Sequence, residues 1–378
     1  MKALKWLIGI FKKDIMLSVS ILAAIISFFI TPPTVETFKG IDWKTLATLF
    51  MLLSILDGFK HENLFLPVIK MAGKMRTRVG LSLFLVFGVF FSSMFVTNDV
   101  SLIIFVPLTM ILFRASGMEN FILPMLALEN IAAVRGSLLT PFGSPQNLFL
   151  FGRSGLSALD FMLMMLPLWI MSIILLVIFI IFLHRKGLKA GLALPEGVSG
   201  EWKKENRAKR IVYLALFVVV ITSIVTRTAY WPYVTLFVAL MLVVFDRSVY
   251  KRVDYALLIT FFCFFLFSSS IAGNATIKEF LNGSVPGHEY IWSIGISQII
   301  SNVPASIVLW PFTAELRPLI YGLDIAGLVT VIGSLASVIN MRIYLSEYPG
   351  KGGSFMLAFE KYSLAFFIIA APLQLLFM

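Results

Sequence analysis

The stretch SSMFVTNDVSLIIFVP, residues 92–107, decides the fold of this chain of 378 residues. Apolar residues run without a charge from Val79 to Val96 and from Val100 to Phe113, and the polar triplet Thr97-Asn98-Asp99 separates the two runs. Irregular polar backbone within a membrane is tolerated only where it is buried in protein or lines a water-filled cavity. The stretch therefore predicts a helical hairpin over residues 79–113, with Asn98 at its tip.

The composition places most of the chain in a lipid bilayer. Hydrophobic residues make up 59% and charged residues only 13%, whereas soluble domains carry roughly 25% charged residues. The net charge of +11 fits basic loops on the cytoplasmic side of a membrane protein. We therefore expect the bilayer, and no nucleic acid, as a partner. Full spans, of about 20 apolar residues each, are expected at 15–30, 43–59, 158–183, 211–226, 230–245, 255–271 and 361–378.

Three further apolar segments are interrupted by polar residues. SNVP at 301–304 interrupts a second predicted hairpin, residues 288–313, and places Asn302 at its tip. TPFGSPQN at 140–147 and IGSLAS at 332–337 interrupt two predicted crossing helices, residues 119–152 and 321–346. Glycine, proline and short polar side chains are the residues that such breaks need. Paired interruptions of this kind indicate the binding site of a secondary transporter.

The interruptions occur in the same order in two halves of the chain. IDWKTLATLF at 41–50 resembles VDYALLITFF at 253–262, and each is followed by an Asn-tipped hairpin and then by a helix broken at Gly-Ser. An odd number of predicted crossings separates the two starting points, which makes the repeats inverted. We expect a first repeat at 1–183, including an extra N-terminal span, a cytoplasmic linker at 184–210 and a second, inverted repeat at 211–378.

Basic residues predict the orientation. The loop 184–210 has eight Lys or Arg residues against three Glu, and 57–78 has five against two acidic residues. The positive-inside rule places both loops and the N-terminus in the cytoplasm, and hence the C-terminus outside. We therefore expect a multi-pass protein of the cytoplasmic (inner) membrane. This charge pattern is the same whether the hairpins are re-entrant or cross as helix pairs.

The polar residues of the interruptions are the candidate ligands for a substrate or an ion. Asn98 and Asn302 offer amides at the two tips, or they cap the half-helices that follow. Asp99 is a carboxylate at membrane depth, which binds Na⁺, carries a proton or pairs with Arg135. Arg135 binds an anionic substrate or pairs with Glu129 or Asp99. The whole predicted set is Thr97, Asn98, Asp99, Thr140, Gly143, Ser144, Asn147, Ser301, Asn302, Gly333, Ser334 and Ser337, with Na⁺ expected at Asn98, Asp99, Gly143, Ser144 and Asn302.

These motifs resemble those of the ion transporter superfamily, which contains the arsenite-efflux permeases, the citrate and divalent-anion/sodium symporters and one class of sodium/proton antiporters. Thr97-Asn98-Asp99-Val100 with Pro107 resembles the first hairpin tip of that family, and Asp99 makes it most similar to the arsenite permease branch. The second tip, at 301–304, and the two breaks, at 140–147 and 332–337, resemble the corresponding segments of that family. The resemblance covers nearly the whole chain. It implies a scaffold domain, a mobile transport domain that moves like an elevator, and a homodimer.

The sequence thus predicts an all-α, inverted-repeat secondary transporter that moves a small anion or oxyanion by alternating access, coupled to H⁺ or Na⁺. The alternatives are a Na⁺/H⁺ antiporter with Asp99 as the exchanging carboxylate and an arsenite or antimonite efflux permease. An enzyme is not expected, because neither a buried histidine nor a second mid-membrane Asp is evident. We expect His61, His184 and His288 to be solvated and to form no metal site. Cys263 is the single cysteine, and no motif implies a cofactor.

Overall fold

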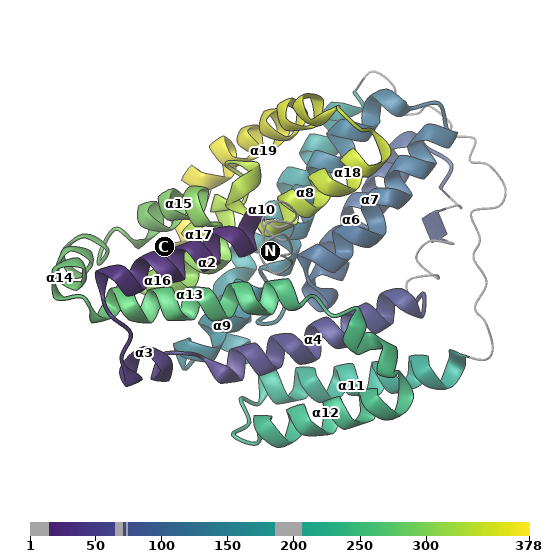
Figure 1. Ribbon diagram of the computed structural model, residues 1–378. Coiled ribbons are helices and arrows are strands. Elements are labelled where there is room, and N and C mark those ends of the chain that lie inside the picture. Colours follow the sequence, from purple (N-terminus) through teal and green to yellow (C-terminus); the bar gives the residue numbers. More distant parts are fainter. Residues whose placement is uncertain (1–14, 65–70, 73–74, 186–205) are drawn as a thin grey trace.

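The computed structural model describes residues 15–64, 71–72, 75–185 and 206–378, which form helices joined by short turns, with no β-strand among them (Figure 1). The apolar segment Leu17–Ile30 of α2 (Ile15–Ile30) and α12 (Trp231–Phe245) are shorter than a full span. Among the described residues, six helical segments are long and apolar enough to cross a membrane, which indicates an integral membrane protein. They are α6 (Arg78–Val96), α7 (Asn98–Ala115), α10 (Ala158–Leu183), α11 (Arg207–Val225), α13 (Tyr255–Gly273) and Gly352–Phe377, most of which is α19 (Gly352–Gln374).

All four interruptions are breaks between helices. Thr97 alone separates α6 from α7, and Ser301 alone separates α15 (Glu289–Ile300) from α16 (Asn302–Leu309). The first broken helix consists of α8 (Ile122–Ser137) and α9 (Pro145–Ser154), and the second consists of α17 (Leu316–Ala326) and α18 (Leu335–Glu347). The short 3-10 helix η5 (Val331–Gly333) lies within the second break.

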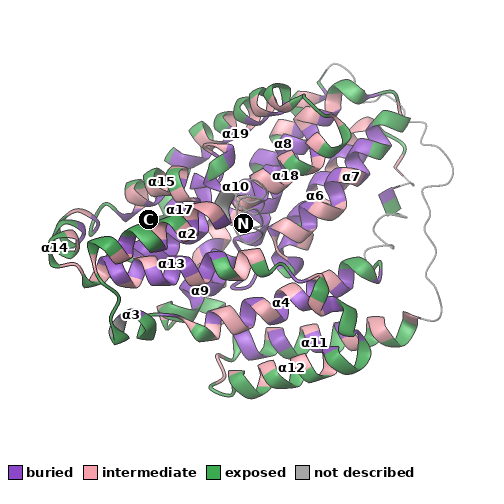
Figure 2. Ribbon diagram, viewed as in Figure 1, coloured by how far each residue is buried: buried purple, intermediate pink, exposed green. Residues whose placement is uncertain are grey.

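The breaks lie inside the protein. Every residue from Met125 to Phe151 is buried, a run that contains the end of α8, the whole first break and most of α9. Leu319 to Leu328 and all of α16 are buried as well (Figure 2). By contrast, α11 and α12 expose apolar side chains along most of their length. Protein therefore shields the backbone groups that the breaks free, as a low-dielectric surrounding requires.

The helices form two groups that meet along α4 (Trp43–His61) and α13 (Figure 1). α11 and α12 pack against α4 in the lower part of the view, whereas α6, α7, α8, α18 and α19 pack together in the upper part. α2 lies along α13. The two segments that are similar in sequence also begin alike, because Asp42 caps α4 by accepting from Thr45 N at 3.0 Å and Asp254 caps α13 by accepting from Leu257 N at 3.0 Å.

Segments predicted on the same side of the membrane contact one another. Near the predicted cytoplasmic ends, Arg252 Nε lies 2.6 Å from Asp57 Oδ2. Near the predicted outer ends, Arg153 Nε lies 3.2 Å from Asp42 Oδ2. Among the described residues, the two ion pairs thus lie at opposite ends of α4, as the predicted orientation requires. Which end faces the cytoplasm stays a prediction.

Two features differ from the predicted elements. The predicted outer loops contain the short helices α3 (Val35–Lys39) and α14 (Ala275–Ser284). The last helix begins at Gly352 rather than at residue 361, because the exposed side chains of Glu360 and Lys361 lie on its outer face and do not interrupt it. The first 14 residues and most of the predicted linker, residues 186–205, lie outside the described residues.

His184 was wrongly predicted to be solvated. It follows α10, is 3% exposed, and its Nε2 lies 2.8 Å from Ser82 Oγ on α6. Its ring stacks on Phe121 with 4.9 Å between the centroids. Burial, together with the charge of Arg78, lowers the pKa of His184, so the imidazole is neutral at pH 7. A histidine at a span end is therefore part of the packing here.

Candidate functional site

The two hairpin tips share one backbone conformation. Thr97 has φ 70° and ψ 156°, and Ser301 has φ 70° and ψ 158°. A positive φ is uncommon for a residue other than glycine and is most costly for a β-branched one such as Thr97. Such a conformation persists only where the surrounding structure enforces it. Because the chain turns within a single residue, Asn98 and Asn302 each become the first residue of a new helix.

The two helix breaks also share one packing arrangement. A Cβ atom added to Gly143 would lie 2.1 Å from the carbonyl oxygen of Ser137, the last residue of α8. A Cβ atom added to Gly333 would lie 2.4 Å from the carbonyl oxygen of Ala326, the last residue of α17. Both contacts are too close for any side chain, so each half-helix ends against a glycine.

Asn147 holds the first break together. Its Nδ2 lies 3.4, 3.1 and 3.4 Å from the carbonyl oxygens of Ser137, Leu138 and Thr140, respectively. Its backbone N–H donates to Ser144 Oγ at 3.2 Å, which caps α9. One amide therefore satisfies carbonyl groups that the end of α8 leaves without helical partners.

A cavity of about 30 Å³, here called the central cavity, lies where the tips and breaks meet. A polar cavity of this volume is large enough to hold a water molecule. Phe261 and Phe264 of α13 form part of its apolar wall. Polar residues from both tips and both breaks line it: Asn98, Asp99, Ser144, Ser301, Asn302 and Ser334.

A second cavity of about 200 Å³ adjoins the central cavity and shares Asp99 and Ser144 with it. It extends between α4 and α13 to the charged residues Asp57, Arg252 and Asp254. These three residues lie at the ends that are predicted to face the cytoplasm. The second cavity therefore leads from the site toward that end of the molecule, whereas the ion pair between Asp42 and Arg153 joins α4 to α9 at the opposite end.

Four helix N-termini meet at the central cavity. α7, α9, α16 and α18 begin at Asn98, Pro145, Asn302 and Leu335, and all four residues line this cavity. Each helix N-terminus carries roughly half a positive charge together with unpaired N–H groups. Asp99 is the only acidic residue in the wall of the central cavity, and its buried Oδ1 accepts no hydrogen bond among the described residues.

Arg135 lies away from both cavities. It is completely buried in α8, and its Nε donates to Ser172 Oγ at 2.9 Å. Among the described residues it forms no ion pair with Asp99 or with Glu129, and Asp324 of α17 is the acid that interacts electrostatically with it. Asp324 is 1% exposed and accepts a hydrogen bond from Gln146, which lines the central cavity.

Asp324 is a second buried Asp, so the expectation that the chain has no second mid-membrane Asp was wrong. Its signal is present in the sequence, because it is the one charged residue in the apolar segment 318–341. Glu129 is also completely buried, and its Oε1 accepts from Thr109 Oγ1. Gln146 and Thr260 line the central cavity and were not predicted.

The predicted residues fall into two groups. Asn98, Asp99, Ser144, Ser301, Asn302 and Ser334 line the central cavity, and Thr97 lines the second cavity. The remaining ones line neither cavity and contact neighbouring segments instead. Thr140 Oγ1 donates to Met94 O at 2.5 Å, and Ser337 Oγ accepts from Asn130 Nδ2 at 3.0 Å. A ligand role stays a prediction for every one of these residues, including those that line the cavities.

Comparison with known proteins identifies the family. Residues 4–333 match the model of a family described as citrate transporter. The chain is 32% identical to the inner membrane protein YbiR of Escherichia coli over 329 residues, which are 84% of each chain. It is 31% identical to an uncharacterized transporter of Methanocaldococcus jannaschii over 325 residues, which are 85% of this chain and 86% of that one. The chain therefore belongs to the citrate transporter family, whose members are membrane transporters and not enzymes.

Proposed function

We propose that this protein is a secondary active transporter that carries a small anion or oxyanion across the cytoplasmic membrane by alternating access, coupled to Na⁺ or H⁺. The observation that carries the proposal is the convergence of four helix N-termini on the central cavity. Their N–H groups and partial positive charges favour an anion. The amides of Asn98 and Asn302 and the hydroxyls of Ser144 and Ser334 add neutral ligands.

Asp99 supplies the coupling in this proposal. While it is ionised, its negative charge repels an anion in the same small chamber. A proton or Na⁺ that binds to Asp99 removes this repulsion, which at about 5 Å and an effective dielectric constant of about 20 amounts to roughly 3 kcal/mol. Cation and anion then favour each other's binding, and by linkage the effect is reciprocal. The unpartnered Oδ1 of Asp99 supports this role.

Alternating access would move the hairpins and broken helices as a transport domain against a scaffold that includes α4, α11 and α12. The matched tips, matched glycine contacts and matched N-caps support the division into two repeats, 1–183 and 211–378, which the predicted orientation makes inverted.

The second cavity opens toward the predicted cytoplasmic end, so the conformation is proposed to be inward-facing, with a cytoplasmic N-terminus. The exposed apolar face of α12 is a surface that lipid or a second copy of this chain can cover. We propose that a second copy covers it, which makes the protein a homodimer.

One observation favours a second candidate, a Na⁺/H⁺ antiporter. Asp99 lines both cavities, so a cation that reaches it from the second cavity need not be accompanied by an anion. An arsenite or antimonite efflux permease of the same architecture is a further form of the main proposal. The antiporter predicts competition between Na⁺ and H⁺ and no effect of anions.

The test is transport in proteoliposomes with the variants Asn98→Ala and Asn302→Ala. Substrates come from a thermal-shift screen of citrate, other carboxylates, arsenite, phosphate, Na⁺ and Li⁺, because a ligand that binds the folded state raises its melting temperature. We expect both variants to lose transport by at least tenfold while they elute and melt like the wild type. Asn282→Ala in α14 is the control, because this side chain is exposed and remote from the cavities. Full transport by both tip variants contradicts the proposed site.

A further inference from the structure

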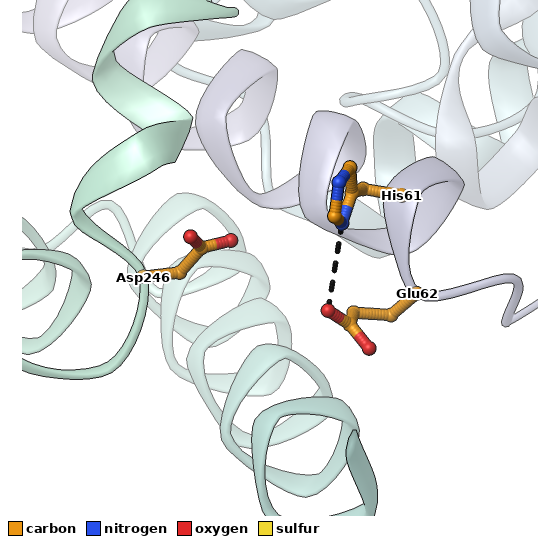
Figure 3. A group of neighbouring side chains, drawn as sticks. All are labelled: His61, Glu62 and Asp246. Carbon is orange, nitrogen blue, oxygen red and sulfur yellow. Dashed lines mark ion pairs between the residues drawn. The ribbon is translucent and has the colours of Figure 1, made fainter. Parts of the chain in front are cut away.

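A cluster of ligand-type side chains lies outside the transport site, where α4 ends. His61 is the last residue of α4, Glu62 follows it, and Asp246 follows α12. One nitrogen or oxygen atom from each of the three side chains lies within 4.8 Å of the other two (Figure 3). The three residues therefore bring the end of one scaffold helix close to the turn that follows another.

Glu62 is the unexplained member of this cluster. Its side chain is 0% exposed, and neither of its carboxylate oxygens accepts a hydrogen bond from any described residue. The nearest basic group is His61, whose Nδ1 lies 3.5 Å from Glu62 Oε1 (Figure 3). A buried carboxylate without hydrogen bonds is strongly unfavourable unless a cation compensates for its lost hydration.

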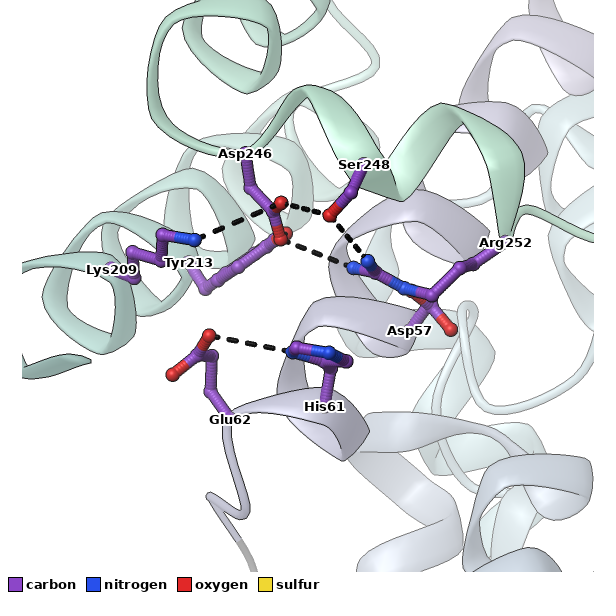
Figure 4. A network of polar contacts seen from close by, with 8 residues as sticks. All are labelled: Asp57, His61, Glu62, Lys209, Tyr213, Asp246, Ser248 and Arg252. Carbon is purple, nitrogen blue, oxygen red and sulfur yellow. Dashed lines mark hydrogen bonds and ion pairs between the residues drawn. The ribbon is translucent and has the colours of Figure 1, made fainter. Parts of the chain in front are cut away.

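The neighbouring charges do not supply that cation. Arg252 is shared between Asp57, at 2.6 Å, and Asp246, at 3.1 Å, and Lys209 Nζ lies 3.8 Å from Asp246 (Figure 4). Among the ion pairs and close contacts of the described residues, the three carboxylates of Asp57, Glu62 and Asp246 therefore face two permanent cations, Arg252 and Lys209. The carboxylate left over is that of Glu62, which pairs with neither Arg252 nor Lys209.

The donor set selects the class of ion. One imidazole nitrogen and two carboxylate oxygens suit divalent first-row transition metals, whereas Ca²⁺ and Mg²⁺ prefer oxygen ligands alone. If the three ligand atoms lie as much as 4.8 Å from one another, a metal ion at their centre is about 2.8 Å from each atom. Metal–ligand bonds are about 2.0–2.2 Å long, so each side chain has to move toward the ion by roughly 0.7 Å. The His61 side chain is 52% exposed, so solvent reaches the cluster.

We propose that His61, Glu62 and Asp246 bind a divalent transition-metal ion, such as Zn²⁺ or Mn²⁺, with water completing its coordination. The bound ion displaces Lys209 from Asp246 and ties the end of α4 to the turn after α12. Arg252, which pairs with Asp246 of this cluster, and Asp57, which pairs with Arg252, also line the second cavity. The metal therefore fixes the scaffold beside the mouth of that cavity.

The experiment uses full-length, tag-free protein in detergent, stripped with EDTA and titrated with ZnCl₂, MnCl₂ or MgCl₂ by calorimetry and thermal unfolding. We expect one Zn²⁺ per chain, a melting temperature that rises with Zn²⁺ and Mn²⁺, and weaker binding of Mg²⁺. Glu62→Gln and His61→Asn are each expected to weaken Zn²⁺ binding at least tenfold. His288→Asn and Glu360→Gln are the matched controls, because both residues are exposed and lie outside the cluster.

Cobalt supplies a readout that does not depend on stability. Co²⁺ bound by an imidazole and two carboxylates gives visible absorption bands, and we expect His61→Asn to remove them. Without metal, Glu62→Gln is expected to melt at or above the wild-type temperature, because it removes an uncompensated buried charge. Zn²⁺ binding that survives both cluster variants, or that is lost in a control variant, overturns the proposal, and so does the absence of saturable Zn²⁺ and Mn²⁺ binding.

Discussion

Asp99 is the residue on which ion coupling depends in the proposed mechanism. Asp99→Asn keeps the shape of the side chain and removes its charge, so it mimics the cation-bound state. We expect anion binding to become about 10- to 100-fold tighter at low Na⁺ and high pH, and to lose its dependence on both ions. Thermal-shift titration at several Na⁺ concentrations measures this. Asp160→Asn is the control, because Asp160 also lies in the first turn of a helix, α10, but is exposed.

An unchanged Na⁺ and pH dependence in Asp99→Asn is the contrary result. It would leave the anion site intact and remove Asp99 from the coupling. Loss of all anion binding in this variant has a different meaning, because it would show that the carboxylate is itself a ligand or that a bound cation bridges it to the anion.

Gly143 and Gly333 test the packing of the breaks. Alanine at either position places Cβ within 2.1 or 2.4 Å of a carbonyl oxygen, so backbone must shift. Overpacking of this kind costs about 1–3 kcal/mol, and we expect a lower melting temperature for Gly143→Ala and Gly333→Ala. Gly283→Ala is the matched control: it lies in α14 with nothing within 4 Å of the added Cβ, and alanine there is expected to stabilise by roughly 0.5–1 kcal/mol.

The sequence predicted the residues that line the central cavity more reliably than it predicted the interactions of buried residues outside the cavity. Asn98, Asp99, Ser144, Asn302 and Ser334 were accessible because polar residues in an apolar run are conspicuous. The interaction of Arg135 with Asp324 was not, because Asp324 lies almost 190 residues away and only the fold brings the two charges into one electrostatic environment. The sequence suggested Glu129 or Asp99 instead.

At the scale of elements, α4, α11 and the turn after α12 are joined through Asp246. Although burial raises the pKa of Asp246, hydrogen bonds from Ser248, Tyr213 and Arg252 and the charge of Lys209 lower it to about 2. A depressed folded-state pKa means that the ionised carboxylate stabilises the fold above the unfolded-state pKa of about 4. This stabilisation is lost as the pH falls toward 2.

Asp246→Asn is therefore expected to lower stability at pH 7 by roughly 1–2 kcal/mol. The difference from the wild type should shrink as the pH falls from 4 to 2. Melting temperatures in EDTA, measured from pH 7 down to the lowest pH at which the wild type stays folded, provide the test. A difference that does not change with pH would assign the effect to packing rather than to charge.

The lengths of the helices were predictable where apolar runs were continuous and less so where a helix is amphipathic. α2, α10 and α12 agree closely with their predicted spans. α14 has polar and apolar residues on different faces, with only Leu281 buried, so a search for apolar runs overlooks it. The start of α19 was missed for the same reason.

At the scale of the molecule, the ion pair between Asp42 and Arg153 joins the proposed scaffold to the proposed transport domain at the end that is predicted to face outward. In a Cys263→Ser background, Asp42→Cys with Arg153→Cys and a short thiol cross-linker should stop transport, and reduction of a cleavable linker should restore it. Arg114→Cys with Glu347→Cys is the control, because the parent side chains lie 3.5 Å apart on α7 and α18 within one domain. Continued transport by the cross-linked outer pair contradicts relative movement of the two groups.

The whole-molecule arrangement was partly accessible from sequence. The order of segments in the two halves predicted the four breaks between helices that the structure has. The correspondence of the two halves and the side of the membrane that each loop occupies stay predictions. The conformational state was not accessible, because two states of a transporter share one sequence and differ by a small free energy. Only the coordinates place the 200 Å³ cavity at the end that contains Asp57 and Arg252.

The single-residue turns at Thr97 and Ser301 have a consequence for evolution as well as for mechanism. Two stretches with almost no letters in common converge on the same backbone angles within 2°. In the proposed mechanism, each half can therefore take the mechanical role of the other, because both contain the same turn. The second conformation would then use the same two turns with the roles of the two halves exchanged.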